Sequence, residues 1–206
     1  MPRPTRIPLF PLDVVLHPGM RLALHIFEPR YKTMIGLCLR DELEFGLILA
    51  ATKAIATLGC TAHILEKTKD YPDGQMDILT EGRAVFRLND LIDEKEYYEG
   101  EVEYVEDEPS ALDPKLEAQL VEAFEQSCTL MSGRPPETLG GEPATLAYRI
   151  AGQLPMELTK RQALLEMRSE SDRRNLVLSW ITDFLPKLLE LQRLRQRAGG
   201  NGHGPN

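Results

Sequence analysis

The period of the apolar residues changes partway along the chain, and this change constrains the fold more than any other feature. Up to about residue 106, short apolar runs alternate with polar residues or stand between Pro, Gly and Asp, as β-strands do. From about residue 112, apolar residues recur at the spacing of one helix face. The sequence therefore predicts an α+β protein with a β-rich first part and a helical second part.

The boundary between the two parts is expected within EDEPSALDP (106–114), where acids and prolines interrupt both patterns. We accordingly predict a β-rich domain at 1–108 and a helical subdomain at 109–197. Residues 198–206 (AGGNGHGPN) have the composition of a disordered tail.

Several stretches of the first part have the composition of strands. They include IPLF, DVVL, RLALHI, FGLILAA and TLGCTAHILE. Glu81-Gly82 separates QMDILT from GRAVFRL, which predicts a two-residue hairpin turn with glycine at positive φ. In YYEGEVEYVEDE, Tyr98, Val102 and Tyr104 share one parity, and Glu99, Glu101 and Glu103 share the other. We expect a half-buried strand there, with an acidic face in water.

Glu28-Pro29-Arg30 interrupts an apolar run and is expected to begin a helix. Proline is favoured in the first helical position, and a preceding carboxylate can meet the exposed N–H groups. The next apolar residues form one stripe at helical spacing, namely Tyr31, Met34, Ile35 and Cys38.

The second part is predicted to contain several helices. Asp113-Pro114 has the form of an N-cap followed by proline, and Gly133 is a suitable end. ATLAYRIAGQL and ELTKRQALLEM are shorter candidates. A long helix is expected from Ser169 or Ser171 onwards, with a kink at Pro186.

Composition excludes several classes of function. The net charge is −8, which disfavours a nucleic-acid backbone as the main partner. No apolar run is long enough to span a bilayer, and prolines with Asp13 interrupt any signal-peptide core, so we predict neither a membrane association nor a signal peptide. The three cysteines are widely spaced, without a zinc-type pattern, which predicts a reduced, cytoplasmic protein without a metal site.

No recognisable catalytic motif is present in these 206 residues. There is no Gly-Lys dipeptide and hence no phosphate-binding loop of the GxxxxGK[ST] kind. None of the six serines lies in a nucleophile motif such as GxSxG. His17, His25 and His63 are interpreted as edge or core residues of strands. We predict a non-enzymatic protein with no catalytic residues and no cofactor.

Almost the whole chain resembles a known family, most specifically in its first thirty residues. PLFPLDVVLHPGMRLALHIFEPRYKTMI is similar to the opening of the N-terminal domain of ATP-dependent Lon proteases. The similarity continues through FGLIL, LGCTAHILE, DGQMDILTEGRAVFRL and YYEGEVEYVED. LAYRIAGQLPMELTKRQALLEMRSESDRRNLVL resembles the helical extension that follows that domain, so the resemblance covers residues from about 5 to about 190.

This resemblance implies a PUA-like β pseudo-barrel followed by a helical bundle. It also implies a free-standing recognition module for unfolded or tagged polypeptides, without the ATPase and peptidase domains, and with a protease or chaperone complex as a further partner. The candidate polypeptide-binding residues lie near the HPGM turn and the first helix: Leu16, His17, Met20, Phe27, Arg30 and Tyr31. Burial in the core is the alternative for these residues and is the favoured interpretation for Phe27. For Arg30, an ion pair with a neighbouring acid is favoured.

Two other functions stay open at the level of sequence. PUA-like barrels elsewhere bind RNA, but the only Arg-rich pieces here, 161–174 and 193–197, lie in or beside the helical part. A small-molecule enzyme with its pocket in the barrel mouth would require converging polar groups that a sequence does not reveal. The oligomeric state is also left open.

Overall fold

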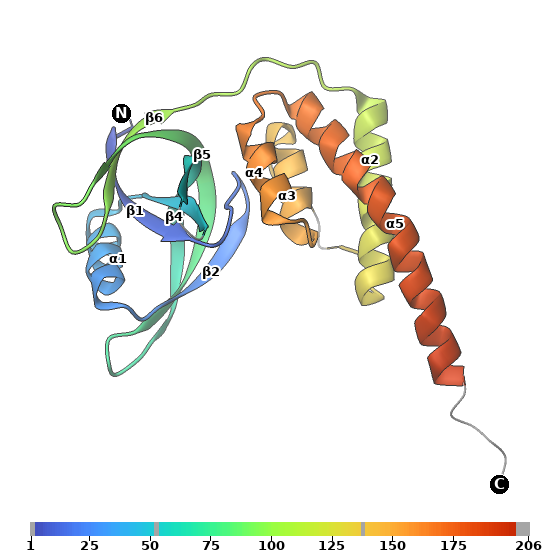
Figure 1. Cartoon of the computed structure of the whole chain (residues 1–206), viewed down its shortest axis with the longest axis horizontal. Coiled ribbons are helices and arrows are strands. Elements are labelled where there is room, and N and C mark those ends of the chain that lie inside the picture. The colour runs from blue at the N-terminus through green and yellow to red at the C-terminus, as the bar shows by residue number, and fades with distance from the viewer. Residues whose placement is uncertain (1–2, 52–53, 137–138, 201–206) are drawn as a thin grey trace, which may run out of the picture. The chain divides into compact units, whose positions relative to one another are not determined.

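The computed structural model describes residues 3–51, 54–136 and 139–200, and the chain forms two compact units. The first unit, here the β unit, contains the residues up to 108 together with 151–168. The second, here the helical unit, contains 109–150 and the residues from 169 onwards. Figure 1 shows both units with most of their elements labelled. No helix in the described part of the chain has the length and apolar character needed to cross a membrane.

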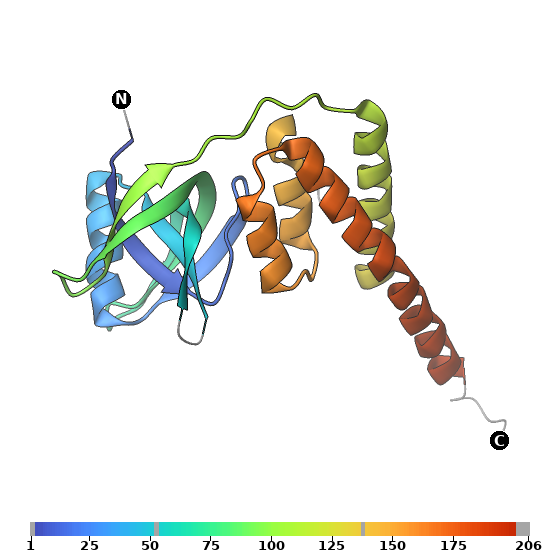
Figure 2. The same ribbon diagram turned by 45° about the horizontal axis from the view of Figure 1, so that its top comes forward.

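The described residues of the β unit contain one six-stranded sheet in the order β2-β5-β4-β3-β1-β6. An additional pairing between β5 and β6 closes β5, β4, β3, β1 and β6 into a ring, and β2 pairs with the first part of β5. Figure 2 shows the strands curving around a common interior. The strands are β1 (Arg6–Leu12), β2 (Arg21–Ile26), β3 (Phe45–Ala51), β4 (Ala54–Asp70), β5 (Met76–Ile92) and β6 (Glu99–Tyr104).

The expected hairpin at Glu81-Gly82 is wrong, because β5 runs through both residues without a turn. Gly82 is required for a different reason: a Cβ there would lie 2.1 Å from the carbonyl oxygen of His17. The backbone of Gly82 exchanges hydrogen bonds with Gly19 and Met20. The reversal of the chain occurs instead at Tyr71–Gln75, where Gly74 has a φ of 79°. The expected strand DVVL is not a strand either.

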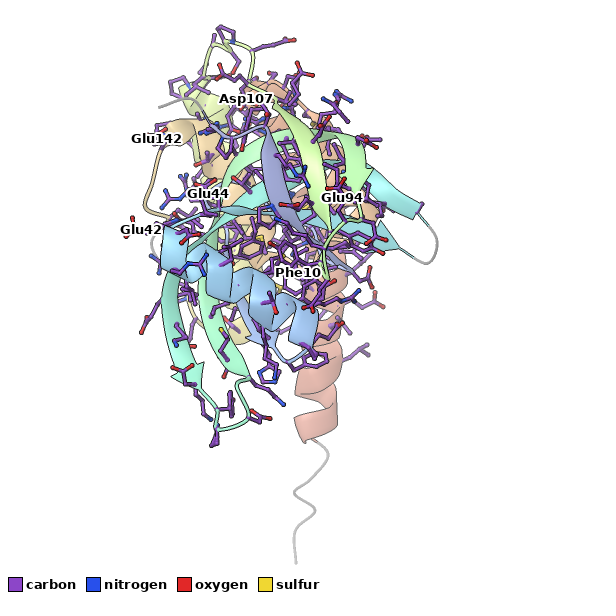
Figure 3. All side chains as sticks on the ribbon, turned by 90° about the vertical axis from the view of Figure 1, so that its left-hand side faces the viewer. Phe10, Glu42, Glu44, Glu94, Asp107 and Glu142 are labelled. Atoms are coloured by element: carbon purple, nitrogen blue, oxygen red, sulfur yellow. The ribbon has the colours of Figure 1, made fainter. Side chains whose placement is uncertain are left out.

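α1 (Pro29–Asp41) begins where the sequence predicts and buries the expected stripe of Tyr31, Met34, Ile35 and Cys38. Glu28 occupies the N-cap position, but its carboxylate accepts from Arg30 and makes no capping bond. The ring of Tyr31 stacks on Phe10 with centroids 4.0 Å apart. α1 therefore covers one side of the main apolar core, on the face that Figure 3 presents.

The acidic strand β6 differs from expectation at Glu99, which is buried although Glu101 and Glu103 are exposed. Its carboxylate binds Arg6 Nη2 at 2.8 Å and Lys95 Nζ at 2.9 Å. Burial raises the pKa of Glu99, but the hydrogen bonds from Lys95 and Arg6 outweigh it, so the pKa lies below its usual value. The parity of residues within β6 does not reveal that Glu99 is buried, because the two cations that pair with it, Arg6 and Lys95, lie outside that strand.

The segment 151–168 packs with the β unit, which differs from the expected continuous helical subdomain at 109–197. It includes the end of α3 (Leu146–Gln153) and all of α4 (Leu158–Glu166). Leu165 belongs to the main core, and Gln162 Nε2 donates to the carbonyl oxygen of Leu58 at 3.2 Å. Glu108 N also donates to the carbonyl of Arg168 at 2.9 Å. The apolar side of α4 is therefore buried against the strands of the β unit.

The helical unit is built mainly from α2 (Pro114–Ser132) and α5 (Glu170–Gly200), with a short 3₁₀ turn at Pro143–Thr145 before α3. The carboxylate of Asp113 caps α2 by accepting from Lys115 N at 2.9 Å. Gly133 ends that helix with a φ of 72°. α5 continues through Pro186 and ends at Gly200, within the range 198–206 for which a tail is predicted. Residues 201–206 lie outside the described part of the chain.

Candidate functional site

The structure does not bring the six predicted binding residues together on one surface. Leu16, His17 and Tyr31 are buried, with exposures of 1%, 0% and 5%. Met20 is partly buried against the main core. Their contribution to binding stays a prediction, but in this conformation the three buried side chains contact the protein interior and not solvent.

The HPGM turn instead holds α4 against the strands. His17 Nε2 forms a 2.9 Å hydrogen bond with the carbonyl oxygen of Arg161. Arg161 donates to the carbonyl oxygens of Leu154 and Met156, and its Nη1 lies 3.9 Å from the sulfur of Met20. Burial lowers the pKa of Arg161, as expected for a cation withdrawn from water. This cluster is a packing junction within the β unit.

Phe27 is exposed by 56%, so its expected place in the core is wrong. On β2, Leu22, Leu24 and Ile26 face inward, and by the same alternation Phe27 falls on the outer side with His25. Arg30 is half-exposed and pairs with Glu28 at 2.8 Å, as expected. Of the six candidates, Phe27 therefore presents the most apolar surface to solvent.

Two further rings accompany Phe27: His25 lies two residues earlier on β2, and Tyr71 follows the end of β4. The ring of His25 stacks on Phe27 with centroids 5.9 Å apart, and the ring of Tyr71 meets His25 edge-on at 5.6 Å. Lys69 lies over the Tyr71 ring at 4.5 Å. Phe27, His25 and Tyr71 are called the Phe27 surface below. Such faces bind apolar or aromatic side chains, because they offer large area with few rotatable bonds.

A polar network fixes the imidazole of this surface. His25 Nδ1 lies 2.6 Å from Asp77 Oδ1, and Tyr71 donates its hydroxyl to Asp77 Oδ2 at 2.9 Å. Asp77 pairs in register with His25 on β2 and with Lys69 on β4, so three strands meet there. The hydrogen bond with Asp77 raises the pKa of His25, and that with His25 lowers the pKa of Asp77. The alternating pattern of β2 could have indicated in the sequence that His25 lies on the outer face. The contact of His25 with Asp77 depends on the register between β2 and β5, which the sequence pattern does not give.

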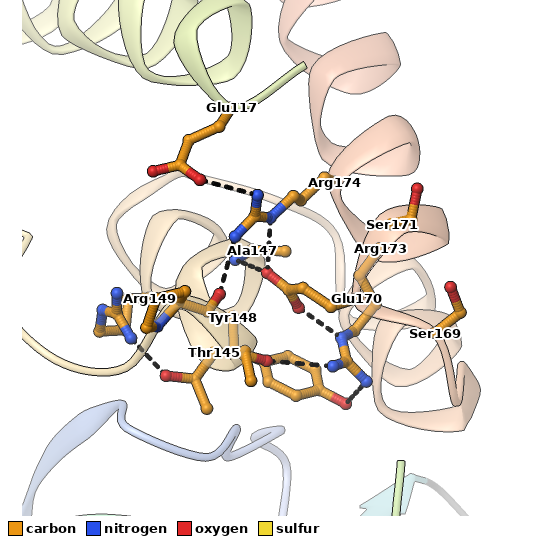
Figure 4. A network of polar contacts seen from close by, with 12 residues as sticks. Glu117, Thr145, Ala147, Tyr148, Arg149, Ser169, Glu170, Ser171, Arg173 and Arg174 are labelled. Carbon is orange, nitrogen blue, oxygen red and sulfur yellow. Dashed lines mark hydrogen bonds and ion pairs between the residues drawn. The ribbon is translucent and has the colours of Figure 1, made fainter. Parts of the chain in front are cut away.

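A second polar cluster lies in the helical unit and is buried. Arg173 and Arg174 donate their Nε atoms to the two oxygens of Glu170, at 2.9 and 3.0 Å. Arg174 also binds Glu117 at 3.0 Å, and Arg173 lies over the ring of Tyr148 at 4.3 Å. Figure 4 shows these contacts, together with the bond from Ala147 N to Glu170. Every group of the cluster faces a protein partner, which indicates a structural role.

Other features offer weaker sites. A cavity of about 440 Å³ in the helical unit combines apolar and charged residues: Glu117, Val121, Glu125, Pro135, Pro136, Leu139, Gly141, Pro143, Leu146 and Arg149. Burial raises the pKa of Cys38 to about 12 and that of Cys60 further, so neither thiol supplies a thiolate near neutral pH. Within the residues that the structure describes, no three His, Cys, Asp or Glu side chains gather as a metal site would require.

Comparison with known proteins identifies a family. The model of the ATP-dependent protease La (LON) substrate-binding domain matches residues 6–183. The Lon protease of Escherichia coli K12 is 30% identical over 93% of this chain, and Lon protease 1 of Hydrogenovibrio crunogenus is 28% identical over 90%. The chain spans about a quarter of the length of these relatives.

Two solved structures are similar in fold. A Lon N-terminal domain protein from Xanthomonas campestris superposes with a TM-score of 0.69 and 26% identity, covering 85% of this chain and 98% of that one. The N-terminal domain of Mycobacterium avium complex Lon protease has a TM-score of 0.62 over 86% of this chain and 98% of that one. At 14% identity, the second likeness shows the fold alone.

Proposed function

Because the chain belongs to the family of Lon substrate-binding domains, we propose that it binds extended, non-native polypeptides and does not cleave them. The observation that carries this proposal is the Phe27 surface, where an exposed phenylalanine stacks on His25. Unfolded polypeptides expose apolar and aromatic side chains that folded proteins bury, and these are the groups that such a surface accommodates.

The proposed contact is small and open to solvent. A few aromatic side chains bury limited area, and an extended polypeptide loses conformational freedom on binding. We therefore expect affinity in roughly the micromolar range, with fast exchange. This suits a protein that samples many clients and transfers them, and we propose a protease or chaperone complex in the cytoplasm as the recipient.

The test is a titration of the protein into a fluorescently labelled, permanently unfolded polypeptide, read by anisotropy without nucleotide. Phe27→Ala is expected to weaken binding by about fivefold or more, since it removes the exposed ring. Leu91→Ala is the matched control, because Leu91 is an exposed apolar residue of the same unit at the far end of β5. Equal affinity of wild type and Phe27→Ala would remove the Phe27 surface from the proposal.

The same titration at two salt concentrations separates apolar from electrostatic recognition. Binding through aromatic surface is expected to survive added salt, whereas binding to phosphate groups falls steeply with it. A labelled single-stranded RNA serves as the second probe. Saturable, salt-sensitive binding to RNA and none to the polypeptide would replace the proposed function by nucleic-acid recognition.

A further inference from the structure

Both ring nitrogens of His25 face oxygen atoms. Nδ1 lies 2.6 Å from Asp77 Oδ1, and Nε2 lies 3.0 Å from Gln75 Oε1. A neutral imidazole carries a single N–H and can donate only one of these hydrogen bonds. The imidazolium carries two N–H groups and satisfies both acceptors.

The orientation of the Gln75 amide determines whether His25 Nε2 donates or accepts in this contact. Gln75 Nε2 donates to Asp73 Oδ2 at 2.7 Å, while the backbone N–H of Gln75 donates to Asp73 Oδ1 at 3.1 Å. Rotating the amide would place its oxygen against the carboxylate of Asp73, where no proton is available. Gln75 therefore presents oxygen to His25, and His25 acts as the donor at both ring nitrogens.

We propose that His25 is a proton switch for the Phe27 surface. In its protonated form it joins β2, through Asp77 and Gln75, to the turn at Tyr71–Gln75. When the proton leaves, Nε2 turns a lone pair toward Gln75 Oε1, that contact becomes repulsive, and the turn separates from the imidazole. The inference rests on the proposed function, since it describes how polypeptide binding by the same surface is regulated.

The charges around the ring agree with this assignment. Asp77 on β5 and Asp73 in the turn both favour the charged imidazole, and the hydrogen bond with Asp77 is the largest cause of the raised pKa of His25. Lys69 on β4 acts on Asp77 and lies over Tyr71, and Lys32 on α1 donates to the carbonyl oxygen of Asp73. The nearest charged partner of the ring is therefore a carboxylate.

The direction of the switch follows from these shifts. The pKa of His25 is raised. The imidazolium that donates to both Asp77 and Gln75 is therefore fully populated below the ordinary histidine pKa of about 6.5, and it is lost as the pH rises through the raised value. The pKa of Asp77 is lowered, so its carboxylate remains charged throughout that range. The ordered surface is the form present at mildly acidic pH, below the ordinary histidine pKa.

The first measurement is an NMR titration of the imidazole nitrogens and of the backbone amides of the turn. We expect His25 to titrate above its ordinary range, with the amides of residues 71–75 shifting over the same interval. Gln75→Ala is expected to uncouple the amides from the ring. A His25 ring that is a neutral tautomer at about pH 6 would overturn the proposal.

The second measurement is polypeptide binding at about pH 6 and about pH 9. Wild type should bind roughly threefold to tenfold more weakly at the higher pH, the range expected for one weakened hydrogen bond. His25→Phe, which keeps an aromatic ring without a titrating group, should lose that difference. The same pH dependence in His25→Phe would overturn the switch, whereas no binding at either pH contradicts the proposed function and leaves the NMR result to decide the switch.

Discussion

The two polar clusters of this protein use similar hydrogen bonds in opposite environments. At the Phe27 surface, the side chains of His25 and Asp77 are 48% and 32% exposed. In the helical unit, Arg173 and Arg174 are fully buried and Glu170 is 3% exposed. Water can replace a lost partner in the first cluster but not in the second. The exposed cluster can therefore be adjusted by pH or a ligand, whereas the buried one must remain completely paired.

The buried cluster also shows how two cations are tolerated without bulk water. Glu170 divides its two oxygens between the two guanidinium groups, and other donors of these groups reach the carbonyls of Pro143 and Ala144, the hydroxyl of Tyr148 and the carboxylate of Glu117. Its carboxylate also accepts from Ala147 N near the beginning of α3. One acid thus joins the start of α5 to the start of α3.

The largest effect is expected for Glu170→Gln. Removing this carboxylate leaves two buried cations short of their shared partner, which should lower the free energy of unfolding by about 3–5 kcal/mol. The measurement is urea denaturation followed by far-ultraviolet circular dichroism. Glu117→Gln is the matched control, because Glu117 binds the same Arg174 but is 46% exposed. Equal losses in both variants would contradict the importance assigned to burial.

Tyr148→Phe should have a smaller effect on the same unit. The variant keeps the ring beneath Arg173 but removes the hydroxyl that accepts from Nη1 at 3.1 Å. We expect a loss of about 1–2 kcal/mol in the free energy of unfolding, typical of a buried donor left without its acceptor. Tyr148→Leu, which also removes the ring, should lose more. A hydroxyl deletion without effect would show that Arg173 finds another acceptor.

Asp77→Asn should alter pH dependence more than stability. In wild type, the raised pKa of His25 provides stabilisation that is complete below about pH 6.5 and is lost as the pH rises through the raised value. Without the carboxylate, the pKa of His25 should fall and this dependence should flatten. Thermal unfolding at a series of pH values measures it. An unchanged His25 pKa in the variant would show that Asp77 is not the main partner of the ring.

The smallest effect on stability is expected for Phe27→Ala. The side chain is mostly in water, so the free energy of unfolding should change by less than about 0.5 kcal/mol even though polypeptide binding falls. Urea denaturation of the purified variant provides the measurement. A large destabilisation would mean that Phe27 has a structural role, and the loss of binding could then reflect damage to the β unit.

Local patterns in the sequence predicted the elements whose ends depend on nearby residues. Pro29 and Pro114 mark the starts of α1 and α2, and Gly133 marks the end of α2, because proline and glycine act on the backbone at their own positions. The change of apolar period predicted a β-rich part followed by a helical part, because the spacing of apolar residues along a short segment also reflects its local structure. The turn at Glu81-Gly82 was mistaken because a glycine needed for close approach and a glycine needed for positive φ look alike in a sequence.

The site itself depended on contacts between distant residues. His25, Asp77 and Tyr71 come together through the pairing of β2, β5 and β4, and a register is set by the whole sheet. The burial of Glu99 required Arg6, which lies 93 positions away. The docking of α4 required the main core, to which Leu165 belongs, and the carbonyl oxygen of Leu58. The sequence by itself determined the elements and the family resemblance, because these depend on local order. Only the tertiary structure decided which side chains are exposed and paired, because burial depends on neighbours distant in the chain.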